Sequence, residues 1–141
     1  MSFGFSAGDF LNAAILIKDI VICLKASGGS ASEYQELMRE LDGLQSALTG
    51  IEHLKASPEQ TPTVNGIKVA ALNCQYILRD FLTKLEAYEK SLATGKTRGW
   101  AVDSTKKIKY ELAMKAEVQN LRTYLMMHTS SLNMRLLTEG L

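Results

Sequence analysis

The chain has 141 residues, the size of a single domain, and is long enough to bury roughly two thirds of its unfolded surface. Hydrophobic residues make up 46% and charged residues 22% of the sequence, which excludes a disordered chain. Sixteen basic against fifteen acidic residues leave a net charge of +1, without the global basic field that nucleic-acid binding usually needs. We therefore expect one domain over residues 1–141 and no nucleic-acid partner.

The first predicted element is a helix over residues 10–25, in a stretch that is apolar almost all the way round. A helical wheel separates a broad apolar stripe, wide enough to fill a core, from a narrow second stripe. Lys18 and Lys25 flank the narrow stripe on one side, and Asp19 flanks it on the other. The broad stripe consists of Phe10, Ala13, Ala14, Ile17, Ile20, Val21 and Leu24, and the narrow one of Leu11, Ile15 and Ile22.

The narrow stripe has three interpretations. It packs under the loops or another helix of the same domain, it forms a surface for self-association or for another domain, or it enters a membrane. On an insertion scale the large apolar residues of 7–26 contribute roughly 3–5 kcal/mol, whereas Lys18 and Asp19 cost roughly 2.5–3.5 kcal/mol each. A lone spanning helix is therefore unfavourable, which leaves an oligomer that pairs these charges or a helix lying in the interface.

Three further helices are predicted over residues 32–55, 62–92 and 104–138, because apolar residues recur in each at alternating steps of three and four. Pro62 suits the first turn of the third helix, and Gly140 suits a C-terminal cap of the last. The predicted core positions are Tyr34, Leu37, Leu41, Leu44, Leu48 and Ile51; then Ile67, Ala71, Cys74, Leu78, Phe81, Leu85, Tyr88 and Leu92; then Tyr110, Met114, Val118, Leu121, Leu125, His128, Leu132 and Leu136.

Short polar stretches rich in Gly, Pro, Ser and Thr separate these segments, at residues 26–32, 56–63 and 93–100. Helices with a sustained heptad pattern and short connections pack as antiparallel neighbours. The sequence therefore predicts an all-α fold, an antiparallel four-helix bundle with a short extra helix near Trp100.

The chain lacks the residue patterns of an enzyme. No nucleophile elbow, zinc-protease motif or phosphate loop occurs, and in front of "TGKT" the position of the first loop glycine holds Lys90. His53 and His128 suit a helix end and a hydrogen-bonded core position. Cys23 and Cys74 are too few for a disulfide framework and fit a reducing cytosol. We expect no catalysis, no cofactor, no metal and no small-molecule substrate.

Basic residues gather around the single tryptophan. Five cations against Asp103 give +5 − 1 = +4 over residues 96–109. One interpretation is a solvated loop and helix start. The other is a contact with anionic lipid, in which each cation contributes about 1 kcal/mol and the tryptophan anchors at the interface. The residues concerned are Lys96, Arg98, Trp100, Lys106, Lys107 and Lys109.

Three stretches carry a family resemblance: "MSFGFSAGDFLNAAILIKDIV", "GGSASEYQELMRELDGLQSAL" and "KIKYELAMKAEVQNLRTYLMMHTSSLNMRLLTEGL". They resemble the N-terminal HeLo-like helical domain of filamentous-fungal proteins, which precedes nucleotide-binding switch domains, repeats or ubiquitin-like domains. The resemblance covers nearly the whole chain. It is most specific over residues 2–9, 32–41 and 115–137, and it departs at Tyr110, where the relatives more often have Trp.

The resemblance implies a helical bundle related to the cell-death domains of fungal heterokaryon-incompatibility proteins and similar to the four-helix domains of necroptotic pseudokinases. In those systems oligomerisation exposes the first helix, which targets or disrupts the plasma membrane. Carried onto this chain, the functional segment lies within residues 3–24 and includes Phe3, Phe5, Phe10, Leu11, Ile15 and Ile22.

The resemblance thus implies a non-enzymatic signalling or effector domain of fungal innate immunity, cytoplasmic and recruited to the plasma membrane on activation. Its partners would be further copies of itself, other helical domains or a C-terminal sensor domain, and anionic lipid. The alternative is an adaptor or scaffold that uses the same stripe to bind another helical domain and never touches lipid.

Overall fold

The computed structural model describes residues 7–26, 32–95 and 100–141, with the side chains of 91–110 outside that description. These ranges contain helices and no strand, which confirms the predicted all-helical class. The helices are α1 (Ala7–Ala26), α2 (Ser32–Glu52), α3 (Thr61–Leu72), α4 (Cys74–Gly95) and α5 (Trp100–Thr138).

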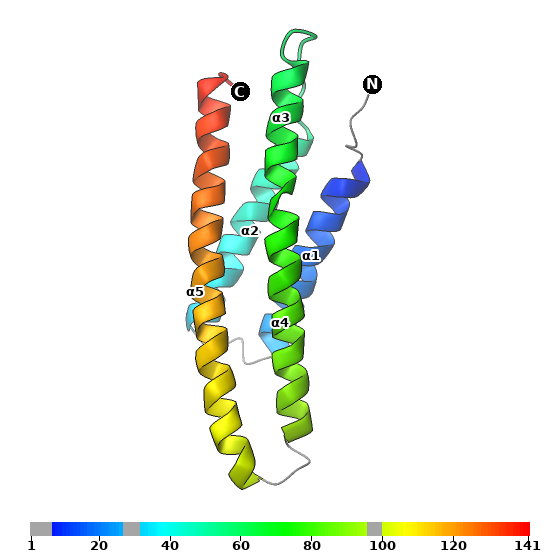
Figure 1. The fold of residues 1–141 in the computed structure, drawn as a ribbon. Coiled ribbons are helices and arrows are strands. Elements are labelled where there is room, and N and C mark those ends of the chain that lie inside the picture. The colour runs from blue at the N-terminus through cyan, green and yellow to red at the C-terminus, as the bar shows by residue number, and fades with distance from the viewer. Residues whose placement is uncertain (1–6, 27–31, 96–99) are drawn as a thin grey trace.

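Helices α3 and α4 form one continuous rod, so the five helices make four rods (Figure 1). Only Asn73 separates them, and its backbone keeps helical angles of φ −60° and ψ −21°. Its N–H is shared between the carbonyls of Val69 at 3.2 Å and Ala70 at 3.3 Å, a tightening of the turn. The single helix predicted over residues 62–92 is therefore interrupted at one residue and keeps its direction. Pro62 lies in the first turn of α3, as predicted.

The prediction of a separate short helix near Trp100 is wrong, because Trp100 is the first residue of the 39-residue helix α5. The predicted cap at the far end of α5 is confirmed. Gly140 has a positive φ of 69°, its N–H donates to Leu137 O at 3.1 Å, and the Leu141 N–H donates to Leu136 O at 2.8 Å. This pair of bonds is the Schellman arrangement that ends many helices.

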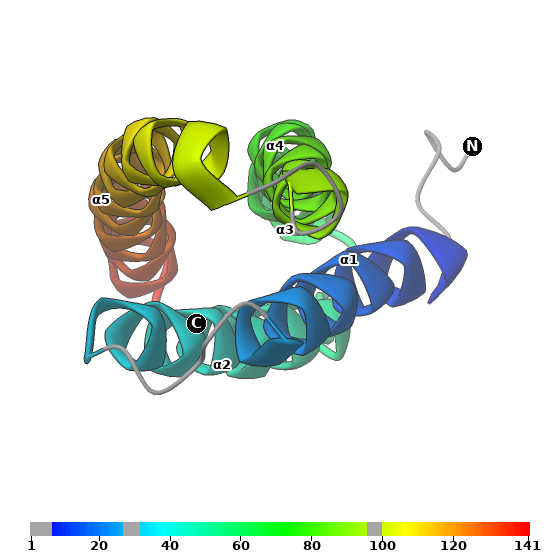
Figure 2. The ribbon, with the colours of Figure 1, turned by 90° about the horizontal axis from the view of Figure 1, so that it is seen from below.

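The four rods are arranged in a ring, and successive rods run in opposite directions (Figures 1 and 2). Within the described residues α1 contacts α2 and α4, and α5 contacts the same two helices, while α1 and α5 do not meet. Helix α3 contacts all the others. The outer surface of α1 is therefore covered by no other helix of the described chain.

Buried side chains from all five helices form one apolar cluster. Nearly every predicted core position for which the structure describes the side chain belongs to it or packs against it. Tyr34, His128 and Leu136 lie at its edge and are half-buried. The buried members include Phe10, Ile17, Ile20 and Leu24 from α1; Leu37, Leu41, Leu44, Leu48 and Ile51 from α2; Ile67 and Ala71 from α3; Cys74, Leu78, Phe81, Leu85 and Tyr88 from α4; and Met114, Val118, Leu121, Leu125 and Leu132 from α5.

Polar contacts join the rods at their edges. Arg122 of α5 donates from Nε to Glu40 of α2 at 3.0 Å, in a pair that is only partly exposed. Helix α1 is tied to α4 differently: the Gln75 amide donates to the backbone carbonyl of Asp9 at 2.9 Å. Burial of the inner face of α1, with these edge contacts, fixes which side of that helix remains outside.

Candidate functional site: the outer face of α1

Helix α1 carries large aliphatic side chains on both its inner and its outer surface. The inner ones are buried, whereas Leu11 is 60%, Ile15 46% and Ile22 55% exposed. We call these three residues the outer stripe. Within the described residues no other helix covers the stripe, whereas the loop residues 27–31 and 96–99 lie outside them. The two interpretations that give the stripe an external partner remain.

Three exposed charges border the outer stripe. Lys18 lies between Ile15 and Ile22, Lys25 lies in the last turn of α1, and Asp19 lies on the opposite flank. Within the described part of the chain none of these three has an ion pair. Charges without an ion pair among the described residues can meet opposite charges of a partner molecule.

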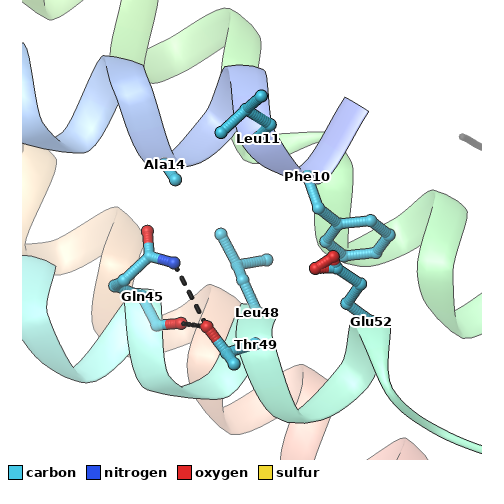
Figure 3. A pocket seen from close by; sticks show the side chains of 7 residues that line it. All are labelled: Phe10, Leu11, Ala14, Gln45, Leu48, Thr49 and Glu52. Carbon is cyan, nitrogen blue, oxygen red and sulfur yellow. Dashed lines mark hydrogen bonds between the residues drawn. The ribbon is translucent and has the colours of Figure 1, made fainter. Parts of the chain in front are cut away.

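A groove opens beside Leu11, between the first half of α1 and the second half of α2 (Figure 3). Its volume is about 320 Å³, which falls in the range of small binding clefts. Aliphatic and aromatic side chains form most of its wall, and three polar side chains of α2 complete it. The lining residues are Phe10, Leu11, Ala14, Gln45, Leu48, Thr49 and Glu52.

The polar side chains of the groove offer more acceptors than donors. The Gln45 amide donates from Nε2 to Thr49 Oγ1 at 3.2 Å, and that hydroxyl donates to the Gln45 backbone carbonyl at 2.9 Å. Gln45 Oε1 is buried and accepts no hydrogen bond. The Glu52 carboxylate lines the groove at the end where Phe10 lies and has no cationic partner in the described chain (Figure 3). The Glu52 carboxylate makes this groove suit a partner that brings a cation.

The opposite flank of α1 meets α4 through a thiol. Cys23 Sγ donates to the Glu89 carboxylate at 3.5 Å. Burial first, and then this carboxylate, raise the pKa of Cys23 to about 11. The thiol therefore stays protonated at neutral pH, and it belongs to the packing of α1 rather than to redox or nucleophilic chemistry.

The other predicted site residues fall into two groups. Phe10 is buried in the core and forms part of the groove wall, whereas Phe3 and Phe5 lie outside the described residues. Lys96 and Arg98 also lie outside them. Trp100, Lys106, Lys107 and Lys109 belong to the first part of α5, but their side chains are not among those described, so the lipid contact stays a prediction.

Sequence reasoning missed a second exposed apolar surface, on the last third of α5. Its members are between 63% and 76% exposed: Met126, Met127, Met134 and Leu137. They lie on the face opposite the buried Leu125 and Leu132. The wheel that separates two stripes on α1 separates these residues from the core positions of α5 as well.

The described chain contains no cluster of three or more His, Cys, Asp or Glu side chains that could hold a metal ion. None of the helices in the described ranges combines the length and the hydropathy that crossing a membrane requires. No family model, curated protein or solved structure matches this chain.

Proposed function

We propose that this chain is an antiparallel four-helix bundle that acts as a non-enzymatic interaction domain and self-associates through the outer stripe of α1. The observation that carries the proposal is the exposure of Leu11, Ile15 and Ile22 on the outer face of α1, whose inner face is packed in the core. An exposed apolar patch with a polar rim is typical of protein contact surfaces, and here Lys18 stands within the row. The HeLo-like resemblance supports a signalling role in which assembly is the active state.

Membrane engagement is the second candidate, and one observation favours it. Lys18 and Lys25 accompany the outer stripe, and cations beside aliphatic residues suit a helix lying on an anionic surface. The inner half of α1 is committed to the core, so only the outer stripe would be offered to lipid unless α1 undocks. We rank this function second, because Lys18 and Asp19 in the middle of α1 make burial of that helix in lipid costly.

The proposal is tested by sedimentation of the full chain over a range of concentrations. We expect a reversible dimer or larger assembly that Leu11→Glu and Ile15→Glu abolish, because a carboxylate in the contact would lose its hydration. Leu112→Glu is the matched control, since Leu112 is 65% exposed on α5. A chain that is monomeric at every concentration, or that assembles equally well with Ile15→Glu, would refute self-association through this stripe.

The same samples separate the two candidates when they are mixed with liposomes of neutral or partly anionic composition and a trapped dye. An interaction domain assembles and ignores both kinds of liposome. A membrane-active domain binds anionic liposomes and releases dye. Replacing Lys106, Lys107 and Lys109 would then weaken lipid binding and leave assembly in solution intact.

A further inference from the structure

The outer face of α1 has the same residue spacing in both directions, although Lys18 replaces an apolar residue at one of its four positions. Leu11, Ile15, Lys18 and Ile22 follow one another at steps of four, three and four residues. Steps of this kind keep four side chains in one row along a helix. Because the spacing is symmetric about a point between Leu16 and Ile17, the positions of two such rows match when the helices run in opposite directions. Leu11 of one copy then stands opposite Ile22 of the other, and Ile15 stands opposite Lys18.

A two-fold axis that pairs two α1 helices in this way keeps their α2 helices on the same side of the contact. Each copy therefore presents the last turn of its α1 near the groove of the other, and every contact occurs twice. In this register Lys25 of the second copy comes level with Gly8, about 3–4 Å along the axis from the Phe10 and Leu11 end of the groove. Glu52 lies at that end (Figure 3).

The charges at these positions are complementary and unused. Within the described residues neither Lys25 nor the Glu52 carboxylate has an ion pair. The cation that the structure places at Glu52 is Lys68, whose ammonium donates at 3.2 Å to the backbone carbonyl and not to the carboxylate. Lysine carries a side chain long enough to bridge the remaining separation.

We propose that the partner of the outer stripe is the α1 helix of a second copy, packed antiparallel with Leu11 opposite Ile22 and with Lys25 of each copy against Glu52 of the other. This inference rests on the proposed self-association and adds its register and its charge contacts. It predicts a closed two-fold dimer, since each stripe is consumed by the other.

Disulfide trapping tests the register. Two variants are made on a Cys23→Ser, Cys74→Ala background, one with Leu11→Cys and one with Ile22→Cys, and are oxidised alone and mixed. We expect a linked dimer in the mixture only, because the two Leu11 positions of a dimer lie about 16 Å apart along the axis. Met127→Cys on α5 controls for random collisions. Efficient linking of Leu11→Cys to itself would show a parallel pair and overturn the inference while self-association stands.

Charge exchange tests the contact at Glu52. Glu52→Lys and Lys25→Glu each turn two attractions into repulsions, so each should weaken the dimer roughly tenfold at low salt. The two changes combined should restore most of the affinity. If the combined variant is as weak as the two losses added, the contact does not exist. Loss of the dimer in Leu11→Glu with no rescue by charge exchange would leave the proposed function standing and refute only this geometry.

Discussion

Isoleucines on the two faces of α1 have the same chemistry and opposite environments. Ile20 is fully buried against the other rods, whereas Ile22, two residues later, is 55% exposed. The inner side chain contributes to folding by leaving water. The outer one leaves water only if something else covers it. Stability and association are therefore carried by different residues of one helix, and substitutions can separate the two.

The largest effect should come from shortening the inner side chain. Ile20→Ala should lower the free energy of unfolding by about 2–5 kcal/mol, because it removes buried apolar surface and leaves a cavity. Ile22→Ala should cost less than about 0.5 kcal/mol in the monomer. Urea unfolding at a protein concentration below dimerisation measures both, since assembly would add apparent stability to one of them. Equal costs for the two variants would contradict the docked position of α1.

The sequence predicts the inner face well because burial leaves a periodic signature. Leu37, Leu41 and Leu44 of α2, like Leu78 and Leu85 of the α3–α4 rod, fall where the three-and-four spacing puts them. The one-residue interruption at Asn73 has no such signature. It depends on a shared hydrogen bond within a turn, which no pattern of apolar residues records.

The sequence predicts a second apolar stripe on α1, but it does not predict whether the rest of the fold covers that stripe. A wheel separates Ile15 and Ile22 from the core residues, yet only the packing of the other rods decides whether a second stripe is covered. The groove could not be predicted from the sequence, because Gln45 and Glu52 come from another helix and lie near Leu11 only in the folded chain. That Gln45 Oε1 accepts no hydrogen bond depends on side-chain geometry, which residue types alone do not predict.

A helix surface that contacts no other part of the chain should accept a larger side chain. A substitution at Gly43, in the middle of α2, tests this expectation. A Cβ built there meets no other atom within 4 Å. Gly43→Ala should therefore stabilise the chain by about 1 kcal/mol, through the lower entropy cost of fixing alanine in a helix. The control is Gly140→Ala, which should destabilise the end of α5 because φ is +69° there. Thermal unfolding of both variants checks the sign; destabilisation by Gly43→Ala would mean that α2 is not free on this side.

His128 is half-buried, between the core and the surface. Its titration should make the free energy of unfolding depend on pH, with a smaller effect than that of Gly43→Ala. Its Nε2–H donates to the Ala71 carbonyl at 3.2 Å, and its ring stacks on Tyr124 at 5.5 Å. Burial lowers the pKa of His128, and the hydrogen bond to Ala71 opposes this in part. The unfolded chain then binds a proton more readily, so stability is full above about pH 6.5 and falls as the pH drops below it.

Unfolding at several pH values checks this expectation. His128→Gln should flatten the fall in stability below about pH 6.5, by less than the cost of Ile20→Ala. His53→Gln, in an exposed position at the end of α2, controls for the loss of a histidine as such. A slope that persists unchanged in His128→Gln would assign the pH dependence to other groups.

The smallest expected effect is on the alkylation rates of the two thiols, Cys23 and Cys74, which lie in different environments. Cys74 is buried in the core, and burial raises its pKa to about 11. Cys23, on the edge of α1, has a similar pKa, but part of the increase comes from Glu89. Glu89→Gln should therefore speed alkylation of Cys23 a few-fold at pH 8, because burial, the larger cause, remains. Cys74 should react only when the chain unfolds. Peptide mass spectrometry measures the alkylation of both thiols in one sample. If Cys23 of the unchanged chain reacts as fast as a free cysteine, the end of α1 is not held against α4.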